Sequence, residues 1–193
     1  LDTAGYADSE GYSEKDPVRE FAYFYRDYVI RSLNQDKPFN QFIVEQLAVD
    51  ELVTSNYQDM TLSQREKVIA TGFLRMAPDG TASGGVDRAV ASNEVMADTI
   101  KIVSSSLLGL TVGCARCHNH RYDPISHVDY HRLRAIFEPA LDWKQWKTPD
   151  QRRISLDAEE NRQQAAVIEA QAKAVEKERD VVLQGHLNRT LQE

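Results

Sequence analysis

The residues best suited to chemistry are concentrated in one short stretch, GCARCHNHRYDP, which runs from Gly113 to Pro124. It contains both cysteines of the chain, Cys114 and Cys117, and two of its five histidines. Cys114, Cys117 and His118 form a C-x-x-C-H pattern, which is typical of haem attachment. Two thiols from one tight turn can add across neighbouring vinyl groups of the porphyrin, and the next residue then lies beneath the iron. The pattern therefore predicts one covalent haem c with His118 as the proximal iron ligand.

Two other chemistries use cysteines at this spacing. A zinc site could combine both cysteines with two of four nearby histidines: His118, His120, His127 and His131. His118 directly follows Cys117 and is poorly placed to reach the same ion, and only the last two histidines have the spacing usual for paired zinc ligands. A thioredoxin-like dithiol needs a cysteine at a helix N-terminus after a strand, whereas Cys114 follows an apolar helical stretch. Zinc therefore remains the main alternative to haem.

The second axial ligand decides what a bound haem does, because methionine, histidine and a vacant position give different chemistry. Met76, beside a glycine-rich loop, is the distal ligand that we predict. Met96, His127, His131 and an open site are the alternatives. His120 is too close to His118 to reach the opposite face of the porphyrin. We expect it to fix the attachment loop by bonding a propionate or a backbone carbonyl, and we expect arginines of the region, among them Arg116, to pair with propionates.

Apolar residues that recur at helical spacing predict the elements that position these side chains. We expect five helices, over about residues 17–33, 38–47, 61–74, 92–110 and 126–137. Asp16, Ser92 and Ser126 are the predicted N-caps. The glycine-rich segment 77–88 is expected to be a mobile surface loop. No strand pair with a hairpin signal and no long repeat is present, so the predicted fold class is all-α, an irregular helical bundle around the haem.

Composition sets the domain organisation and excludes some partners. The chain of 193 residues predicts a haem domain over 1–140, a linker over 141–155 and a long amphipathic helix over 156–193, interrupted at Gly185. A formal net charge of −7 argues against a nucleic-acid partner. The weakly polar stretch 100–112 is too short to span a membrane. Because the chain begins at Leu1 without signal-peptide features, we expect an N-terminally truncated piece of a longer protein.

Four blocks of sequence in one collinear order resemble the planctomycete-type cytochrome c family. They are YADSEGY (6–12), YRDYVIRSLNQDKPFNQFIVEQLAVDEL (25–52), IATGFLRM (69–76) and LGLTVGCARCHNHRYDPISHVDYHRL (108–133). The resemblance covers about residues 1–137 and implies a c-type cytochrome domain of an exported protein, periplasmic or on the cell surface. The chain departs from the family pattern at Val49, where glycine is usual, and at His127 and His131, where other residues are common. The resemblance implies no particular catalysed reaction.

These observations predict an electron carrier rather than a catalyst in its own right. The expected function is one-electron transfer through a single haem to a redox partner protein, with no membrane span in this part of the protein. A peroxidase- or oxidase-like haem enzyme with an open distal site is one alternative. A zinc-stabilised interaction module is another, and the C-terminal helix is expected to support self-association.

Overall fold

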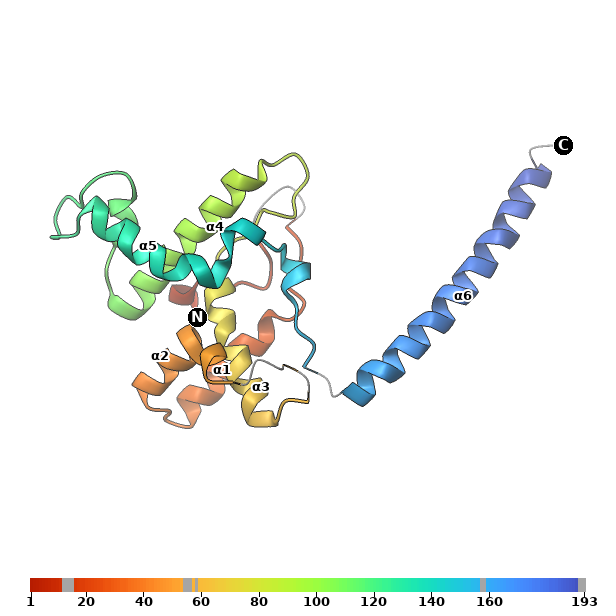
Figure 1. The fold of residues 1–193 in the computed structure, drawn as a ribbon, viewed down its shortest axis with the longest axis horizontal. Helices are drawn as coiled ribbons and strands as arrows, with labels where there is room; N and C mark the ends of the chain where they lie inside the picture. The colour runs from red at the N-terminus through yellow and green to blue at the C-terminus, as the bar shows by residue number, and fades with distance from the viewer. Residues whose placement is uncertain (12–15, 54–56, 58, 157–158, 191–193) are drawn as a thin grey trace. The chain divides into compact units, whose positions relative to one another are not determined.

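The computed structural model describes residues 1–11, 16–53, 57, 59–156 and 159–190. Over these residues the chain forms six α-helices and no β-strand, which confirms the all-α fold class. The helices, labelled in Figure 1, are α1 (Ala22–Asn34), α2 (Phe39–Ala48), α3 (Leu62–Ala70), α4 (Arg88–Val103), α5 (His127–Leu141) and α6 (Glu159–Thr190). None of them is long and apolar enough to cross a membrane.

The chain divides into two compact units. One comprises residues 1–55 and 62–154, and the other comprises residues 56–61 and 155–193. In the second unit, α6 continues through Gly185, so the predicted interruption there is wrong. A single glycine costs a helix only about 1 kcal/mol, and the surrounding Ala, Glu, Lys, Arg and Gln residues favour helix. Apolar side chains of α6, such as Val175, are largely exposed, and self-association through them stays a prediction.

The first helix begins later than the sequence predicts. Asp16 was expected to cap it, but Asp16 has a left-handed backbone with φ 37°. Its carboxylate instead accepts hydrogen bonds from the Ser9 hydroxyl at 3.0 Å and from the backbone N–H of Gly11 at 2.7 Å. This side chain closes the preceding loop, and α1 starts only at Ala22, with Phe21 at the N-cap position.

The start of α4 also differs from the prediction. Asp87, not Ser92, is the N-cap, and its carboxylate accepts hydrogen bonds from the N–H groups of Ala89 and Val90 at 2.8 and 3.2 Å. The Ser92 hydroxyl donates to the Ala89 carbonyl inside the helix. The predicted cap at Ser126 is confirmed, since Ser126 and Asp129 form a reciprocal capping box at the start of α5.

The glycine-rich segment before α4 lacks helix, as predicted, but it is anchored rather than free on the surface. Asp79 and Thr81 in this segment are 6% and 9% exposed. The Trp146 indole N–H donates to the Thr81 hydroxyl at 3.0 Å, and Arg152 forms an ion pair with Asp79. Residues after α5 therefore hold this segment in place, which sequence reasoning missed because these partners are more than 60 positions apart.

The core of the first unit consists of separate apolar clusters. One joins α1 to the short helical turn Thr71–Arg75 and includes Tyr25, Tyr28 and Phe73. Another joins α4, α5 and the turn Val112–Arg116, and it contains four buried residues: Ile100, Val112, Ala115 and Tyr130. Figure 1 shows α4 and α5 packed beside each other in this part of the unit.

A buried carboxylate ties α1 to α2. Glu45 is 4% exposed and accepts hydrogen bonds from the Tyr28 hydroxyl at 2.8 Å, from Lys37 Nζ at 2.5 Å and from Gln41 Nε2 at 2.8 Å. Burial by itself raises the pKa of Glu45, but the three donors outweigh it and hold this pKa below its usual range. The carboxylate is thus stabilised in its charged form.

Replacing this carboxylate by an amide, Glu45→Gln, tests that role. We expect the free energy of unfolding near pH 7 to fall by about 2 kcal/mol, because a buried charge-assisted hydrogen bond is lost. The folded-state pKa lies below the unfolded value of about 4.3, so the contribution is complete above that pH and is lost as the pH falls through the folded pKa. Urea denaturation of both proteins across this range measures the difference. A difference that does not shrink in acid contradicts the assignment.

Candidate functional site

Cys114 lies in a short 3₁₀ segment that buried neighbours hold in place, and Cys117 directly follows the end of this segment. The segment Val112–Arg116 follows a wide helical turn, Ser104–Leu108, which ends at Gly109 with φ 65°. Val112 and Ala115 are 5% and 0% exposed and pack in the cluster with α4 and α5. Cys114 and Cys117 are exposed, and both thiols are free. We call residues 112–118 the CxxCH turn, in which the apolar residues anchor the backbone and leave both sulfurs accessible.

The hydrogen bonding of His118 defines which ring nitrogen is available. Its Nδ1 lies 2.7 Å from the carbonyl oxygen of Asn119. A carbonyl can only accept, so Nδ1 must carry the proton, and the lone pair of the neutral ring is on Nε2. The ring is exposed, and no described residue bonds Nε2. Histidines that bind metals commonly donate the other ring N–H to a backbone carbonyl in this way.

His120 stabilises the loop after the CxxCH turn. Its Nδ1 accepts hydrogen bonds from the backbone N–H groups of Tyr122 and Asp123, at 3.2 and 2.9 Å. Nε2 must then carry the proton, and it donates to the Thr111 hydroxyl at 2.9 Å. The expectation that His120 fixes this loop is met by the geometry, but its partners are two amides and a hydroxyl rather than a carbonyl.

Arg116 has a partner that the sequence did not indicate. Its guanidinium makes two hydrogen bonds to the Glu94 carboxylate on α4, at 2.9 and 2.6 Å. These bonds hold the pKa of Glu94 below its usual range. The pair fastens the CxxCH turn to α4, 22 residues earlier in the chain. The sequence predicts that Arg116 pairs with a propionate. In this structure its guanidinium instead donates both hydrogen bonds to Glu94.

Asn119 connects the CxxCH turn to α5. Its side-chain oxygen accepts the backbone N–H of His127 at 2.9 Å, while its carbonyl accepts from His118. No sequence pattern pointed to Asn119, because an asparagine between two histidines carries no periodic or capping signal of its own. One residue thus fixes both the proximal-ligand candidate and the first turn of α5.

The remaining candidate ligands do not converge on the cysteines. His127 and His131 face each other on α5, with their Nε2 atoms 3.1 Å apart. Within the part of the chain that the structure describes, no group of three or more His, Cys, Asp or Glu side chains is arranged to hold a metal ion. The four-ligand zinc site considered from the sequence is therefore not assembled among these side chains.

Met76 lies in a different cluster from the CxxCH turn. It is 5% exposed and packs with Tyr25, Phe73 and their neighbours, while its carbonyl accepts a hydrogen bond from Arg19 at 3.0 Å. The two clusters share a contact with Phe137. Ligation of iron by Met76 stays a prediction, and in this structure its side chain serves as core.

Apolar side chains next to the CxxCH turn are exposed to solvent, and one buried hydroxyl below the turn has no hydrogen-bond partner among the described residues. Leu108 and Leu110, just before the turn, and Tyr122, just after it, are 57%, 41% and 85% exposed. Beneath the turn, the buried hydroxyl of Tyr130 has no hydrogen-bond partner among the described residues. An apolar side chain in contact with water is unfavourable, and a buried phenol hydroxyl without a hydrogen-bond partner costs free energy because it has lost its bonds to water. A bound group with an apolar face would cover the exposed side chains.

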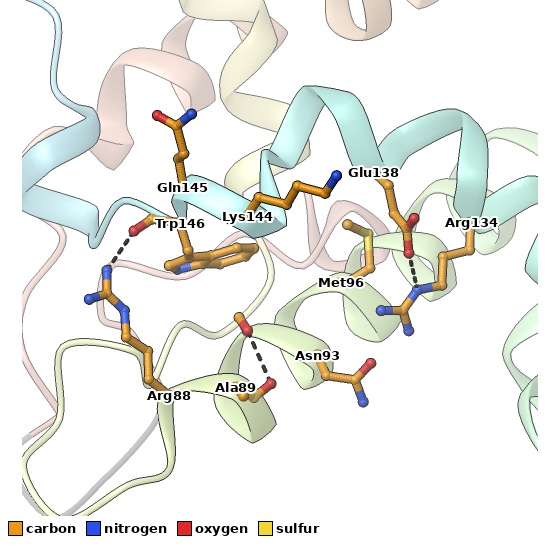
Figure 2. Close-up of a pocket in the computed structure, with 10 residues that line it drawn as sticks. Arg88, Ala89, Asn93, Met96, Arg134, Glu138, Lys144, Gln145 and Trp146 are labelled. Carbon is orange, nitrogen blue, oxygen red and sulfur yellow. Dashed lines mark hydrogen bonds and ion pairs between the residues drawn. The ribbon is translucent and has the colours of Figure 1, made fainter.

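A hollow in the first unit lies away from the CxxCH turn. It is a cleft of about 820 Å³ between the first half of α4 and the C-terminal half of α5, lined by Met96, Trp146 and several charged side chains. Figure 2 shows Arg88 bonding the Trp146 carbonyl and Arg134 paired with Glu138 at its edges. Neither cysteine lines it. Met96, an alternative distal ligand in the sequence analysis, does line it, so this candidate is placed in the cleft and not at the CxxCH turn.

Removing the ring of His120 tests its role in the loop. In His120→Ala we expect the amides of Tyr122 and Asp123 to exchange with solvent about fivefold faster, because each loses a hydrogen bond of about 1 kcal/mol. Amide exchange followed by NMR measures this. The amide of Asp129, which bonds the Ser126 hydroxyl at 3.1 Å, is the internal reference and should be unchanged. Unaltered exchange at both loop amides would show that the ring does not hold the loop.

Comparison with known proteins gives one family. Residues 1–141 match the model of a family described as PSCyt2, protein of unknown function (DUF1549). Searches of curated proteins and of solved structures found no match. The matched range agrees with the resemblance seen over residues 1–137, although the family description names no cofactor or reaction. With nearly three quarters of its length matched, the chain belongs to the PSCyt2 (DUF1549) family.

Proposed function

We propose that the CxxCH turn binds one haem c covalently and that the first unit is an electron-transfer domain of an exported protein. The observation that carries the proposal is the bond from His118 Nδ1 to the Asn119 carbonyl, 2.7 Å long. It leaves Nε2 as a basic, exposed ligand atom directly after two free, exposed thiols. Metal-binding histidines are oriented by this kind of outer bond.

The chemistry of the Cys114, Cys117 and His118 side chains suits haem c, as does their order in the sequence. Cys114 and Cys117 would each add a thiol across one vinyl group, forming a thioether without a leaving group. The buried side chains of Val112 and Ala115 fix the backbone that carries both sulfurs. The exposed Leu108 and Leu110 before the turn would supply apolar contact for the macrocycle.

When bound, the haem supplies a one-electron Fe(III)/Fe(II) couple. The protein's part is to hold His118 with one tautomer and one orientation, and to keep the loop after it closed through His120. Because the turn is exposed, a partner protein could approach it directly, and small, weak interfaces are usual for redox encounters. The exported location follows from this proposal, since covalent haem attachment is completed outside the cytoplasm.

The sixth ligand of the haem iron would distinguish an electron-transfer protein from a haem enzyme. Met76 would have to leave the apolar cluster around Tyr25 and Phe73 to reach an iron at the exposed turn. This burial favours a variable or open sixth position, with which a peroxidase- or oxidase-like activity would be compatible. A low-spin, six-coordinate spectrum would support Met76 or another internal ligand, and a high-spin spectrum would support the alternative.

Spectra of the full chain, produced with an export signal in a host that attaches haem c, test the proposal. We expect the wild type to show a c-type reduced-minus-oxidised spectrum and to keep its colour in acid and denaturant. The Cys114→Ala/Cys117→Ala variant should lose the colour on denaturation, because no thioether remains. His118→Ala should change the spectrum, because the proximal nitrogen is gone.

The matched control is His186→Ala, which removes a histidine of α6 in the second unit. Its spectrum should equal that of the wild type. A wild-type protein that carries no covalent haem, or a His118→Ala spectrum identical to the wild type, contradicts the proposal.

A further inference from the structure

A second ligand pair lies at the start of α5. His127 and His131 are four residues apart, so their side chains lie on the same face of the helix, one turn apart. Their Nε2 atoms are 3.1 Å apart, and their ring planes meet at 82°. His131 is exposed and His127 is half-buried, which leaves the pair accessible from solvent.

We propose that His127 and His131 chelate a divalent late transition-metal ion such as Ni²⁺, Cu²⁺ or Zn²⁺. Two histidines at this spacing on a helix are a known way to present two nitrogen ligands to one ion. Imidazole suits these metals, and affinity rises towards copper along the first-row series. This inference does not depend on haem binding at the CxxCH turn, because neither histidine is part of that turn.

The distance between the two nitrogens matches the requirement of a shared ion. With metal–nitrogen bonds of about 2.05 Å, a separation near 3.1 Å corresponds to an N–metal–N angle of roughly 98°. That angle lies between the values for square and tetrahedral coordination. Without the ion, one ring donates its proton to the other. Metal binding needs both Nε2 lone pairs, so the donating ring takes the tautomer with its proton on Nδ1, and the soft χ2 torsions let both lone pairs turn towards the metal.

The surroundings hold the pair in place without occupying its ligand atoms. Tyr130, between the two histidines in sequence, is fully buried, and its ring meets that of His131 edge-on at 5.1 Å between centroids. The backbone N–H of His127 is bonded to Asn119 Oδ1 at 2.9 Å, and Ser126 caps the helix. The positions of both rings are thus fixed by a capped first turn and a buried neighbour, as a preformed chelate requires.

The two histidines are the only protein ligands that this site would supply. No third His, Cys, Asp or Glu joins them among the described residues, so water would complete the coordination. The site differs from the zinc site considered from the sequence, because it uses no cysteine. An open coordination sphere of this kind is suited to exchange of the ion or to binding an additional ligand rather than to holding the fold together.

Titration of the full chain with NiCl₂ by isothermal calorimetry tests this site. Free thiols are first capped with iodoacetamide, so that the cysteines cannot bind the metal. We expect one Ni²⁺ per chain, with the affinity of His127→Gln and of His131→Gln each lowered by at least about tenfold, since even outer-shell changes cost that much. The matched control, His186→Gln, removes a histidine in the second unit and should bind within about twofold of the wild type.

Circular dichroism of the variants checks that glutamine leaves the helix intact, which the retained backbone bond of His127 predicts. Wild-type affinity in His131→Gln would overturn the proposal. So would an equal loss of affinity in His186→Gln, because binding would then belong to scattered surface histidines. A variant of His127 or His131 that loses nickel binding but keeps a normal c-type spectrum shows that this site is independent of haem attachment. A chain that binds nickel but carries no covalent haem shows the same independence.

Discussion

The proposed haem chemistry depends on one short hydrogen bond, from the Nδ1–H of His118 to the Asn119 carbonyl. This bond places the proton on Nδ1 and leaves the lone pair on Nε2, the atom that we propose as the iron ligand. Asn119 also accepts the first backbone N–H of α5. The orientation of the proximal-ligand candidate and the start of the helix that carries the second histidine pair therefore depend on the same residue.

The rest of the first unit keeps the CxxCH turn stiff while its sulfurs stay accessible. Buried Val112 and Ala115 anchor the turn from below, and the two bonds between Arg116 and Glu94 fasten it to α4. His120 closes the following loop through two backbone amides. Because these contacts are made by the protein alone, the ligand atoms are positioned before any cofactor binds, which lowers the ordering cost of binding.

Local signals in the sequence predicted much of this arrangement. The 3.6-residue periodicity located every helix of the first unit, and the capping box at Ser126 gave the start of α5 correctly. Local signals failed where a side chain had a competing partner. Asp16 closes a loop instead of capping α1, and Asp87 takes the role expected of Ser92.

Long-range contacts were beyond the reach of the sequence. The pairing of Arg116 with Glu94, the anchoring of Asp79 by Arg152, and the burial of Met76 in a different cluster all join segments that are far apart in the chain. The residues of the candidate site, Cys114, Cys117 and His118, were proposed from their spacing and from the family resemblance, and haem binding by them stays a prediction. The hydrogen bonds that distinguish His118 from His120 could be seen only in the folded structure.

The intact mass of this chain, produced with an export signal and measured under denaturing conditions, tests the central claim most directly. We expect the mass of the polypeptide plus one haem, with neither Cys114 nor Cys117 reacting with iodoacetamide. A polypeptide of unmodified mass with two reactive thiols, isolated from a host that attaches haem c to a known cytochrome, would contradict it.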